Sequence, residues 1–231
     1  GAPLTPLFHQ LIVTKSKINF PTCILNIGGI SNATIIKEPI GSFNFESRDL
    51  GPGNCLVDTW IRKNSKQKFD FNGNLAANGK VNEIILEQAI DLYTNRIEKN
   101  KNSFDVSDFD ISFARGLSLE DGTATLTDFT AKIISDELSA MMTKSEILDK
   151  INEIFVCGGG RKNNFLIDKI RKKILNFKKI KLVDNYNIDG DYVESQAFAF
   201  LAIRSILNLP ISFPTTTGCL KPISGGEIIE Y

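Results

Sequence analysis

The sequence is poor in the side chains that serve most often as nucleophilic or redox centres. It contains one histidine, His9, and no G-x-S-x-G motif, so a Ser-His-Asp triad would depend on that residue alone. A lone histidine beside Phe8 is usually structural, and we predict that role for it. The four cysteines are widely spaced and form no C-x-x-C pair. Because Cys23 and Cys157 lie inside apolar runs, we expect buried free thiols of a reducing compartment instead of disulfides.

The sequence also lacks a surplus of charge and a long apolar run. Lys+Arg and Asp+Glu both total 27, which gives no indication of a nucleic-acid or acidic-membrane partner. No apolar run approaches the length of a membrane span, and no signal peptide is visible. The chain starts at Gly1 without an initiator Met, so we expect a fragment or a trimmed polypeptide. Its 231 residues, 42% of them hydrophobic, are enough for one large or two modest domains.

The stretch from Thr22 to Ile36 is typical of a strand, a glycine turn and a second strand. The adjacent Gly28 and Gly29 allow positive φ and let the backbone approach a ligand without a Cβ between them. Ser31 and Asn32 are expected to place a hydroxyl and an amide at the lip of this turn. Exposed N–H groups in such a turn form an anion nest that suits a phosphate. An ordinary hairpin with a Gly-Gly turn is the alternative.

A second glycine turn lies at Gly51-Pro52-Gly53. Asn54 is predicted to cap a helix that turns Leu56, Val57 and Trp60 inward. A helix N-terminus delivered in this way would be a second site for an anion. Asp49 precedes the turn and has the chemistry to hold a metal or a sugar hydroxyl, or it is a simple turn residue.

A third glycine turn, 158–160, follows an apolar strand at 154–157. A strand, a glycine-rich turn and a helix bring backbone close to a nucleotide, although the motif is neither G-x-G-x-x-G nor a Walker loop. The alternative is a tight turn that needs glycine for close packing. Glu194 lies in the first turn of a helix predicted over 191–209. It is either a partner of the helix dipole or a carboxylate directed into a cleft.

The remaining pattern favours an α/β fold, because strands alternate with helices of 12 to 20 residues. Helices are predicted over 81–93 and 126–141, and a short strand over 181–184. The run 7–13 fits either a short helix or a strand. Between 161 and 181, nine basic residues face one acidic residue. A nucleic-acid-binding stripe is one interpretation, but the basic positions fall on the outer side of an amphipathic helix, which favours a solvated face.

Several blocks of sequence, taken in order, resemble the anhydro-N-acetylmuramic acid kinase family of the actin/hexokinase-like ATPase superfamily. The resemblance extends from Gly1 to Tyr231 and concerns the C-terminal part of those kinases. The blocks that carry it are Gly1–His9, Asn26–Asn32, Asp49–Asn54, Asp58–Trp60, Gly116–Leu126, Cys157–Gly160 with Asn163-Asn164, Glu194–Phe200, Thr217-Gly218 and Gly225-Gly226.

The resemblance implies an actin/hexokinase-like (ribonuclease H-like) α/β lobe with a mixed β-sheet flanked by helices. Residues 1–209 would form the second lobe of a two-lobed sugar kinase, and residues 210–231 a tail that packs back toward the first lobe. The implied reaction uses ATP and Mg²⁺ to convert 1,6-anhydro-N-acetylmuramic acid to N-acetylmuramic acid 6-phosphate, with ring opening by water. This would be a cytoplasmic step of cell-wall recycling.

The resemblance also implies roles for individual residues. The loop expected at the phosphates is matched by Gly28, Gly29, Ser31 and Asn32. The loop expected beside the adenosine is matched by Gly158, Gly159, Gly160 and Asn163. The candidates for the sugar side of the cleft are Asp49, Gly51, Gly53, Asn54 and Glu194. No metal ligand is assigned.

Two departures from the family pattern concern catalysis. The N-terminal phosphate-binding segment of the G-T-S-x-D-G-x-D kind is absent, and the general-base aspartate is expected upstream of Gly1. Where the family shows a Lys-Ser pair and then Arg, this chain has Asn102-Ser103 and Val106. We therefore expect this polypeptide to be inactive without the missing N-terminal lobe as partner. A non-catalytic remnant, a nucleic-acid-binding protein and a homodimer remain open alternatives.

Overall fold

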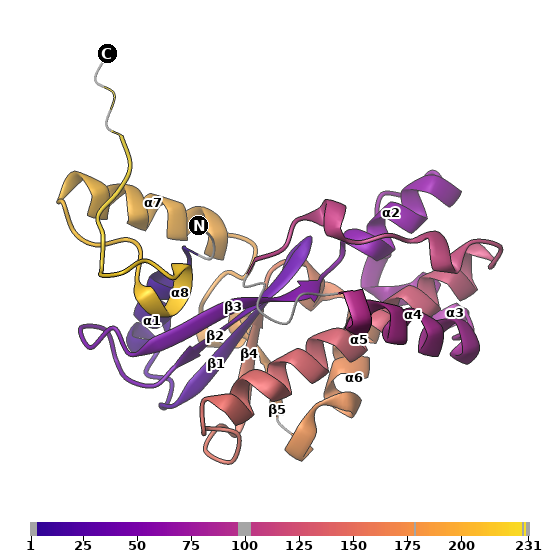
Figure 1. Cartoon of the computed structure of the whole chain (residues 1–231), viewed down its shortest axis with the longest axis horizontal. Coiled ribbons are helices and arrows are strands. Elements are labelled where there is room, and N and C mark those ends of the chain that lie inside the picture. The colour runs from indigo at the N-terminus through magenta and orange to yellow at the C-terminus, as the bar shows by residue number, and fades with distance from the viewer. Residues whose placement is uncertain (1–3, 97–102, 178, 228, 230–231) are drawn as a thin grey trace.

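The computed structural model describes residues 4–96, 103–177, 179–227 and 229. Its centre is a five-stranded mixed sheet with strand order β3-β2-β1-β4-β5 (Figure 1). The strands are β1 (Thr22–Ile27), β2 (Ile30–Ile36), β3 (Phe45–Pro52), β4 (Glu153–Cys157) and β5 (Lys179–Leu182).

The first three strands form an antiparallel meander, and β4 and β5 run parallel to β1. This order is that of a ribonuclease H-like lobe, so the predicted α/β class with a mixed sheet is confirmed. The predicted strand–turn–strand unit over 22–36 is also correct, whereas β5 begins two residues before the predicted 181–184. Because β1 and β4 are parallel neighbours, their carboxyl ends meet at one edge of the sheet.

Helices cover both faces of this sheet. The helices are α1 (Pro6–Lys15), α2 (Cys55–Asn64), α3 (Asn74–Asn78), α4 (Glu83–Arg96), α5 (Leu119–Lys144), α6 (Asn164–Lys173), α7 (Val193–Ile206) and α8 (Pro214–Thr217). Figure 1 shows α5 and α6 on one face, α1 and α7 on the other, and α2 to α4 together beyond one end of the sheet. The ambiguous run 7–13 is therefore helical. Among the described residues, no helix is both long and apolar enough to cross a membrane.

Successive side chains of β1 point to opposite faces of the sheet, and each face has its own hydrophobic core. Leu25 and Ile27 pack with α5 and α6 residues such as Ile134 and Ile170, whereas Ile24 packs with residues of α1 and α7 on the opposite face. A third cluster joins α2, α4 and α5 around Trp60. The predicted free thiols are confirmed, since all four cysteines are free and both Cys23 and Cys157 are fully buried.

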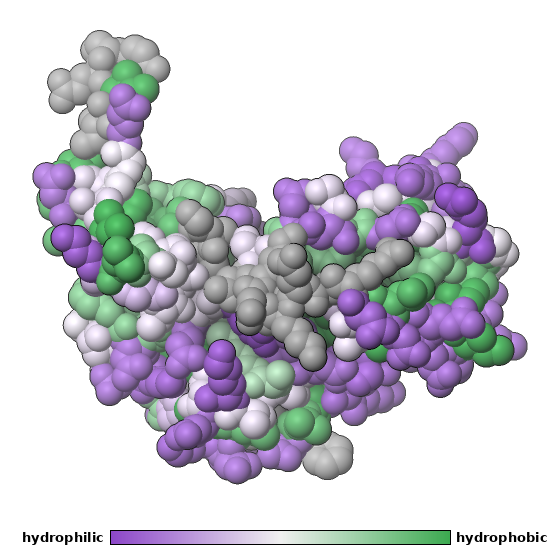
Figure 2. Space-filling view, viewed as in Figure 1, coloured by the Kyte–Doolittle hydropathy of each residue, from purple (hydrophilic) through white to green (hydrophobic). Residues whose placement is uncertain are grey.

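The tail begins on the lobe itself. Phe213 is buried and stacks on Phe43, with its edge contact to Phe45 of β3. An antiparallel bridge joins Ser212 to Ile223. Figure 2 shows hydrophobic side chains gathered beside α7 in this region. Packing of the tail toward a first lobe stays a prediction.

Asp128 joins the two helices beneath the sheet. Its side chain is 4% exposed on α5, and its oxygens lie 2.6 Å from Lys169 Nζ and 2.7 Å from Lys173 Nζ of α6. Burial alone would raise its pKa, but the two lysine hydrogen bonds outweigh burial and hold that pKa below its ordinary value. We expect Asp128→Asn to lower the free energy of unfolding at pH 7 by about 2 kcal/mol, because two half-buried ammonium groups lose their partner.

The pH dependence of this loss has a definite sign. Because the folded pKa lies below the unfolded value of about 3.9, the contribution is complete above that value and disappears as the pH falls through the folded pKa. Urea unfolding should therefore give a larger difference between wild type and Asp128→Asn at pH 7 than at pH 3. The control is Asp136→Asn on the same helix, whose exposed pair with Lys132 is expected to contribute below about 0.5 kcal/mol. Equal effects of the two substitutions would contradict this account.

Candidate functional site

Three glycine turns meet at the edge of the sheet where β1 and β4 end. The turn after β1 is fixed to the start of α2 by its carbonyl groups: Gly29 O accepts from Gly53 N (2.9 Å) and Cys55 N (3.2 Å), and Gly28 O accepts from Asn54 N (2.8 Å). These three N–H groups already donate to backbone carbonyls and are not free to bind an anion. The prediction of an anion site at the α2 N-terminus is therefore wrong for them. The same bonds hold the β1–β2 turn in place.

Glycine is required at two positions by close backbone approach. A Cβ on Gly53 would lie 2.3 Å from Gly28 O, and a Cβ on Gly158 would lie 2.3 Å from Asn26 Oδ1 at a φ of +79°. Gly29 differs, because its Cβ would meet only Val106 Cγ2, at 3.9 Å. Neither Gly28 nor Gly29 has positive φ, so that part of the prediction is wrong. The fold therefore does not require glycine at position 29, and its predicted contact with a ligand stays a prediction.

Val106 lies beside the β1–β2 glycine turn. It is 50% exposed in a short 3₁₀ turn (Val106–Asp108) and lies over Gly29. The sequence comparison identified this residue as a departure from a family arginine, and the structure puts the departure beside the turn predicted to hold phosphate. Asn102, the other departure, lies outside the described residues.

Two adjoining cavities open at this edge. The larger, of about 660 Å³, lies among α2, the residues before α3, and the turn after β4. The smaller, of about 260 Å³, lies between the β1 and β4 turns and the starts of α1 and α7. Gly159 and Asp191 line both cavities.

The larger cavity combines aromatic rings with polar groups. Phe69 and Phe71 are 54% and 64% exposed and line it, which offers flat apolar surface at its rim. Asn54 occupies the N-cap position of α2 but makes no capping hydrogen bond, so its predicted capping role is wrong and its side chain lines the cavity. Asn163 also lines it, although its Oδ1 accepts from Leu166 N (3.0 Å) and caps α6. Burial raises the pKa of Asp58 in the same wall.

The smaller cavity brings together residues that are far apart in the sequence. Gly28, Gly158 and Glu194 all line it, so two glycine turns and one predicted sugar-side carboxylate share one space. Asn26 and His9 line it as well. Gly160 does not; a Cβ there would lie 2.3 Å from Ile27 Cγ2, so this glycine serves packing.

Ser31 is not at the lip of its turn. The residue is fully buried, and its Oγ donates toward Gly51 O (3.1 Å) and Pro52 O (3.2 Å). An irregularity of the β2–β3 ladder between Ser31 and Asn32 accompanies this orientation. The prediction of a lip hydroxyl is therefore wrong. Asn32 is half-buried, and its buried Oδ1 has no hydrogen-bond partner among the described residues; as an acceptor, this oxygen suits a donor and not a phosphate oxygen.

Asp49 lies behind the turn and lines neither cavity. It is 7% exposed, burial raises its pKa, and its Oδ2 accepts from Phe104 N at 2.9 Å. The carboxylate therefore anchors the segment that carries Val106. Gly51 also faces inward, since a Cβ there would lie 2.7 Å from Tyr93 Oη. The structure brings neither residue to the two cavities, which are lined by other predicted residues such as Gly28, Asn54 and Glu194.

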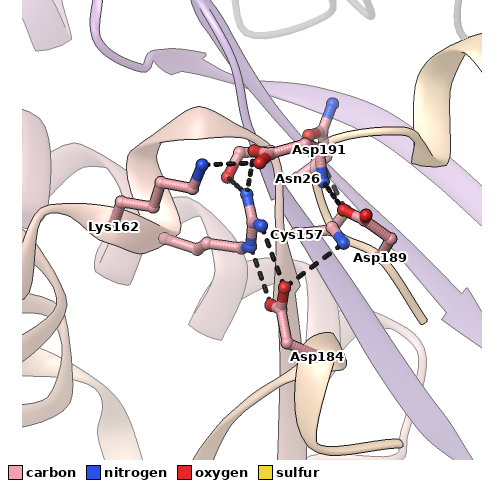
Figure 3. Close-up of polar contacts among 9 residues, drawn as sticks. Asn26, Cys157, Lys162, Asp184, Asp189 and Asp191 are labelled. Atoms are coloured by element: carbon pink, nitrogen blue, oxygen red, sulfur yellow. Dashed lines mark hydrogen bonds and ion pairs between the residues drawn. The ribbon is translucent and has the colours of Figure 1, made fainter. Parts of the chain in front are cut away.

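Arg161 is the structural centre of the third turn, a role that sequence reasoning missed. Its guanidinium is 4% exposed and binds Asp184 through two bonds of 2.8 and 2.9 Å. It also donates to Asp191 at 2.7 Å and to Gly158 O at 3.1 Å, and Lys162 Nζ lies 2.5 Å from Asp191 (Figure 3). The pKa of Arg161 is raised by these hydrogen bonds, and the pKa of Asp191 is lowered to about 2. The only signal in the sequence was an arginine directly after three glycines.

The basic stripe is largely neutralised by ion pairs. At least six of the nine basic residues between 161 and 181 pair with carboxylates, namely Arg161, Lys162, Lys169, Arg171, Lys173 and Lys181. Such pairing removes the free positive charge that phosphate backbones need. It favours the solvated-face interpretation over nucleic-acid binding.

The strand order and the glycine turns at the ends of β1 and β4 define a ribonuclease H-like lobe of the actin/hexokinase-like class. A family model described as anhydro-N-acetylmuramic acid kinase matches residues 1–230, and the chain belongs to this family. The predicted resemblance is thereby confirmed.

Two sequence relatives carry the name of this family. A relative from Pelagibacter ubique (strain HTCC1062), named anhydro-N-acetylmuramic acid kinase, is 48% identical over 230 residues, which cover 100% of this chain and 60% of the relative. A relative of the same name from Haemophilus influenzae is 34% identical and covers 99% and 61% of the two chains. Component A of the Acidaminococcus fermentans (R)-2-hydroxyglutaryl-CoA dehydratase aligns over 84% of this chain and 69% of its own, with a TM-score of 0.48 and 14% identity. The chain thus spans about 60% of the length of the curated relatives it matches.

Proposed function

We propose that the protein to which this chain belongs is an ATP-dependent kinase of 1,6-anhydro-N-acetylmuramic acid. It would yield N-acetylmuramic acid 6-phosphate with ring opening by water, in the cytoplasmic recycling of cell wall. Family membership supports the reaction class. The observation that carries the site is Gly29, where the fold leaves open space beside a turn whose carbonyls are fixed.

The residues present fit a nucleotide laid along the edge of the sheet. The Gly28-Gly29 turn would contact the phosphates through its backbone. The larger cavity, with Phe69 and Phe71 at its rim, would hold the base by stacking. Glu194 in the adjoining smaller cavity would face the sugar.

Catalysis in this arrangement is mainly positioning and charge stabilisation. Mg²⁺ would neutralise charge on the phosphates. The described residues contain no cluster of three or more His, Cys, Asp or Glu side chains able to hold a metal ion, so we assign no magnesium ligand to them. The proposal takes the general-base aspartate from the part of the longer relatives that this chain does not match. Turnover would then need both parts.

Gly29→Ala tests the phosphate site directly. A Cβ at this position meets no atom closer than 3.9 Å, so the melting temperature should not change. The methyl group would block the approach of a phosphate, and we expect MgATP affinity to fall at least tenfold, or about 1.4 kcal/mol. Calorimetric titration of the chain with MgATP measures this. Gly225→Ala, which lies in the tail beside Ile211, is the control and should bind MgATP as wild type does. Unchanged affinity in Gly29→Ala would remove the turn from the site.

Turnover separates an active kinase from a non-catalytic remnant. The 231-residue chain can be assayed alone and joined to the preceding segment of the Pelagibacter ubique relative. Phosphorylation of the anhydro sugar by the joined polypeptide, with none by the chain alone, is the expected result. Absence of turnover in both would contradict the kinase proposal and favour the remnant.

A further inference from the structure

His9 is buried at the floor of the smaller cavity. The residue is 1% exposed, and its Nδ1 lies 2.8 Å from Thr34 Oγ1 of β2. It is one of the residues that line the cavity, together with Gly28 and Glu194. The hydrogen bond of the His9 ring among the described residues uses Nδ1 and leaves its other nitrogen, Nε2, without a partner. A polar atom beside an open space, without a partner in the protein, is the kind of atom that a bound ligand satisfies.

The neighbouring hydroxyls determine which ring nitrogen carries the proton. Ser47 Oγ donates to the Ala33 carbonyl oxygen at 2.8 Å, and a carbonyl can only accept. The Ser47 proton is therefore used, and Thr34 must donate to Ser47 across their 3.1 Å contact. With its own proton used, Thr34 can only accept from His9, so the proton of the neutral imidazole lies on Nδ1. Only the donor order His9 Nδ1 to Thr34 Oγ1, Thr34 Oγ1 to Ser47 Oγ, and Ser47 Oγ to Ala33 O gives each of these hydrogen bonds one proton.

We infer that His9 Nε2 is a hydrogen-bond acceptor that faces the smaller cavity and binds a hydroxyl or N–H group of the sugar substrate. This inference rests on the proposed function and adds to it a substrate-binding residue that sequence reasoning treated as purely structural. A neutral imidazole protonated at Nδ1 offers no N–H to a phosphate oxygen at Nε2. Burial lowers the pKa of His9 to about 4, so the ring stays neutral at pH 7.

The other charged groups of the cavity agree with a donor-rich, uncharged part of a ligand. Glu194 and Asp191 both line it, and both carboxylates only accept hydrogen bonds when ionised. Three acceptors around one space disfavour phosphate and suit hydroxyl groups. We therefore place the phosphates on the Gly29 side of the β1–β2 turn, outside this cavity.

The tautomer can be read directly because His9 is the only histidine of the chain. A ¹⁵N–¹H spectrum of the histidine-labelled chain at pH 7 should show a protonated Nδ1 and a pyridine-type Nε2. Thr34→Val removes the acceptor of the Nδ1 proton and should shift the population toward the other tautomer. A protonated Nε2 in the wild-type chain would overturn the inference without any ligand.

Binding is tested in the joined polypeptide with 1,6-anhydro-N-acetylmuramic acid, the His9 signal being assigned by its loss in His9→Gln. The sugar should move the Nε2 resonance as it accepts a hydrogen bond. If backbone signals move and Nε2 does not, the His9 inference fails while the sugar kinase proposal stands. If no signal moves at saturating sugar, both fail.

Kinetics of the joined polypeptide give a second readout. We expect His9→Phe to raise the KM for the sugar at least tenfold with the KM for ATP unchanged, because a ring without nitrogen cannot accept the hydrogen bond. His9→Gln, which keeps a hydrogen-bonding group near the Nε2 position, should recover part of the loss. Equal changes of both KM values in all variants would indicate a structural role only.

Discussion

Arg161→Met is expected to lower the free energy of unfolding by about 3 kcal/mol, the low end for breaking a buried ion pair. The guanidinium is 4% exposed and holds two carboxylates and a carbonyl. Those carboxylates, Asp184 and Asp191, are 40% and 44% exposed, so water partly stabilises them once the arginine is gone. For a domain stabilised by about 5–15 kcal/mol, the loss is a large share of the total.

The matched control is Lys162→Met. Lys162 pairs with the same Asp191, but its side chain is 59% exposed, and such pairs contribute about 0–1 kcal/mol. Urea unfolding of both variants measures the difference. A loss from Arg161→Met no larger than that from Lys162→Met would show that the buried guanidinium does not hold the third turn.

Gly158→Ala is expected to cost a similar or larger amount, about 3–5 kcal/mol, because backbone strain and steric overlap add. The residue has φ 79° and ψ 169°, a region that is essentially restricted to glycine. An added Cβ would also lie 2.3 Å from Asn26 Oδ1 and 2.7 Å from Ile27 O, and the backbone oxygen cannot rotate away. The variant should unfold at lower temperature and lose MgATP binding with the shape of its turn.

Gly159→Ala is the adjacent control. A Cβ there would approach only Asn54 Nδ2, at 3.9 Å, and φ is not positive. We expect its free energy of unfolding to change by less than about 0.5 kcal/mol, as for an unstrained surface substitution. Thermal unfolding followed by circular dichroism compares the pair. If the two variants melt at the same temperature, the conformation assigned to Gly158 is wrong.

Local signals in the sequence were sufficient for most helices and for the strands other than β3, which was not predicted. The β-rich residues around Gly28 and the apolar run before Gly158 each end at a glycine turn, and both turns lie where the chain pattern indicated. Helix ends were less predictable: α6 ends at Lys173, although the next residue, Ile174, is also apolar and buried. Tertiary burial, and not helical periodicity alone, explains an apolar residue at that position.

The chemistry of the site depended more on contacts between distant residues. Ser31 turns into the β2–β3 ladder beside an irregularity that no residue pattern predicts. Asp49 is used to hold Phe104, 55 residues away. Arg161 finds its partners 23 and 30 residues further along the chain. A glycine motif indicates where backbone approaches closely, but only the assembled fold shows which polar groups are already used.

The position of Asp191 has a thermodynamic consequence. This carboxylate is part of the wall of both cavities and is held by Arg161 and Lys162. A ligand in one cavity that displaces it changes the free energy of binding in the other. By linkage, the second ligand then changes the affinity for the first by the same factor. The two cavities are therefore connected through a single side chain, and cooperativity between their ligands would be measured as a departure from independent binding in one titration performed with and without the other ligand.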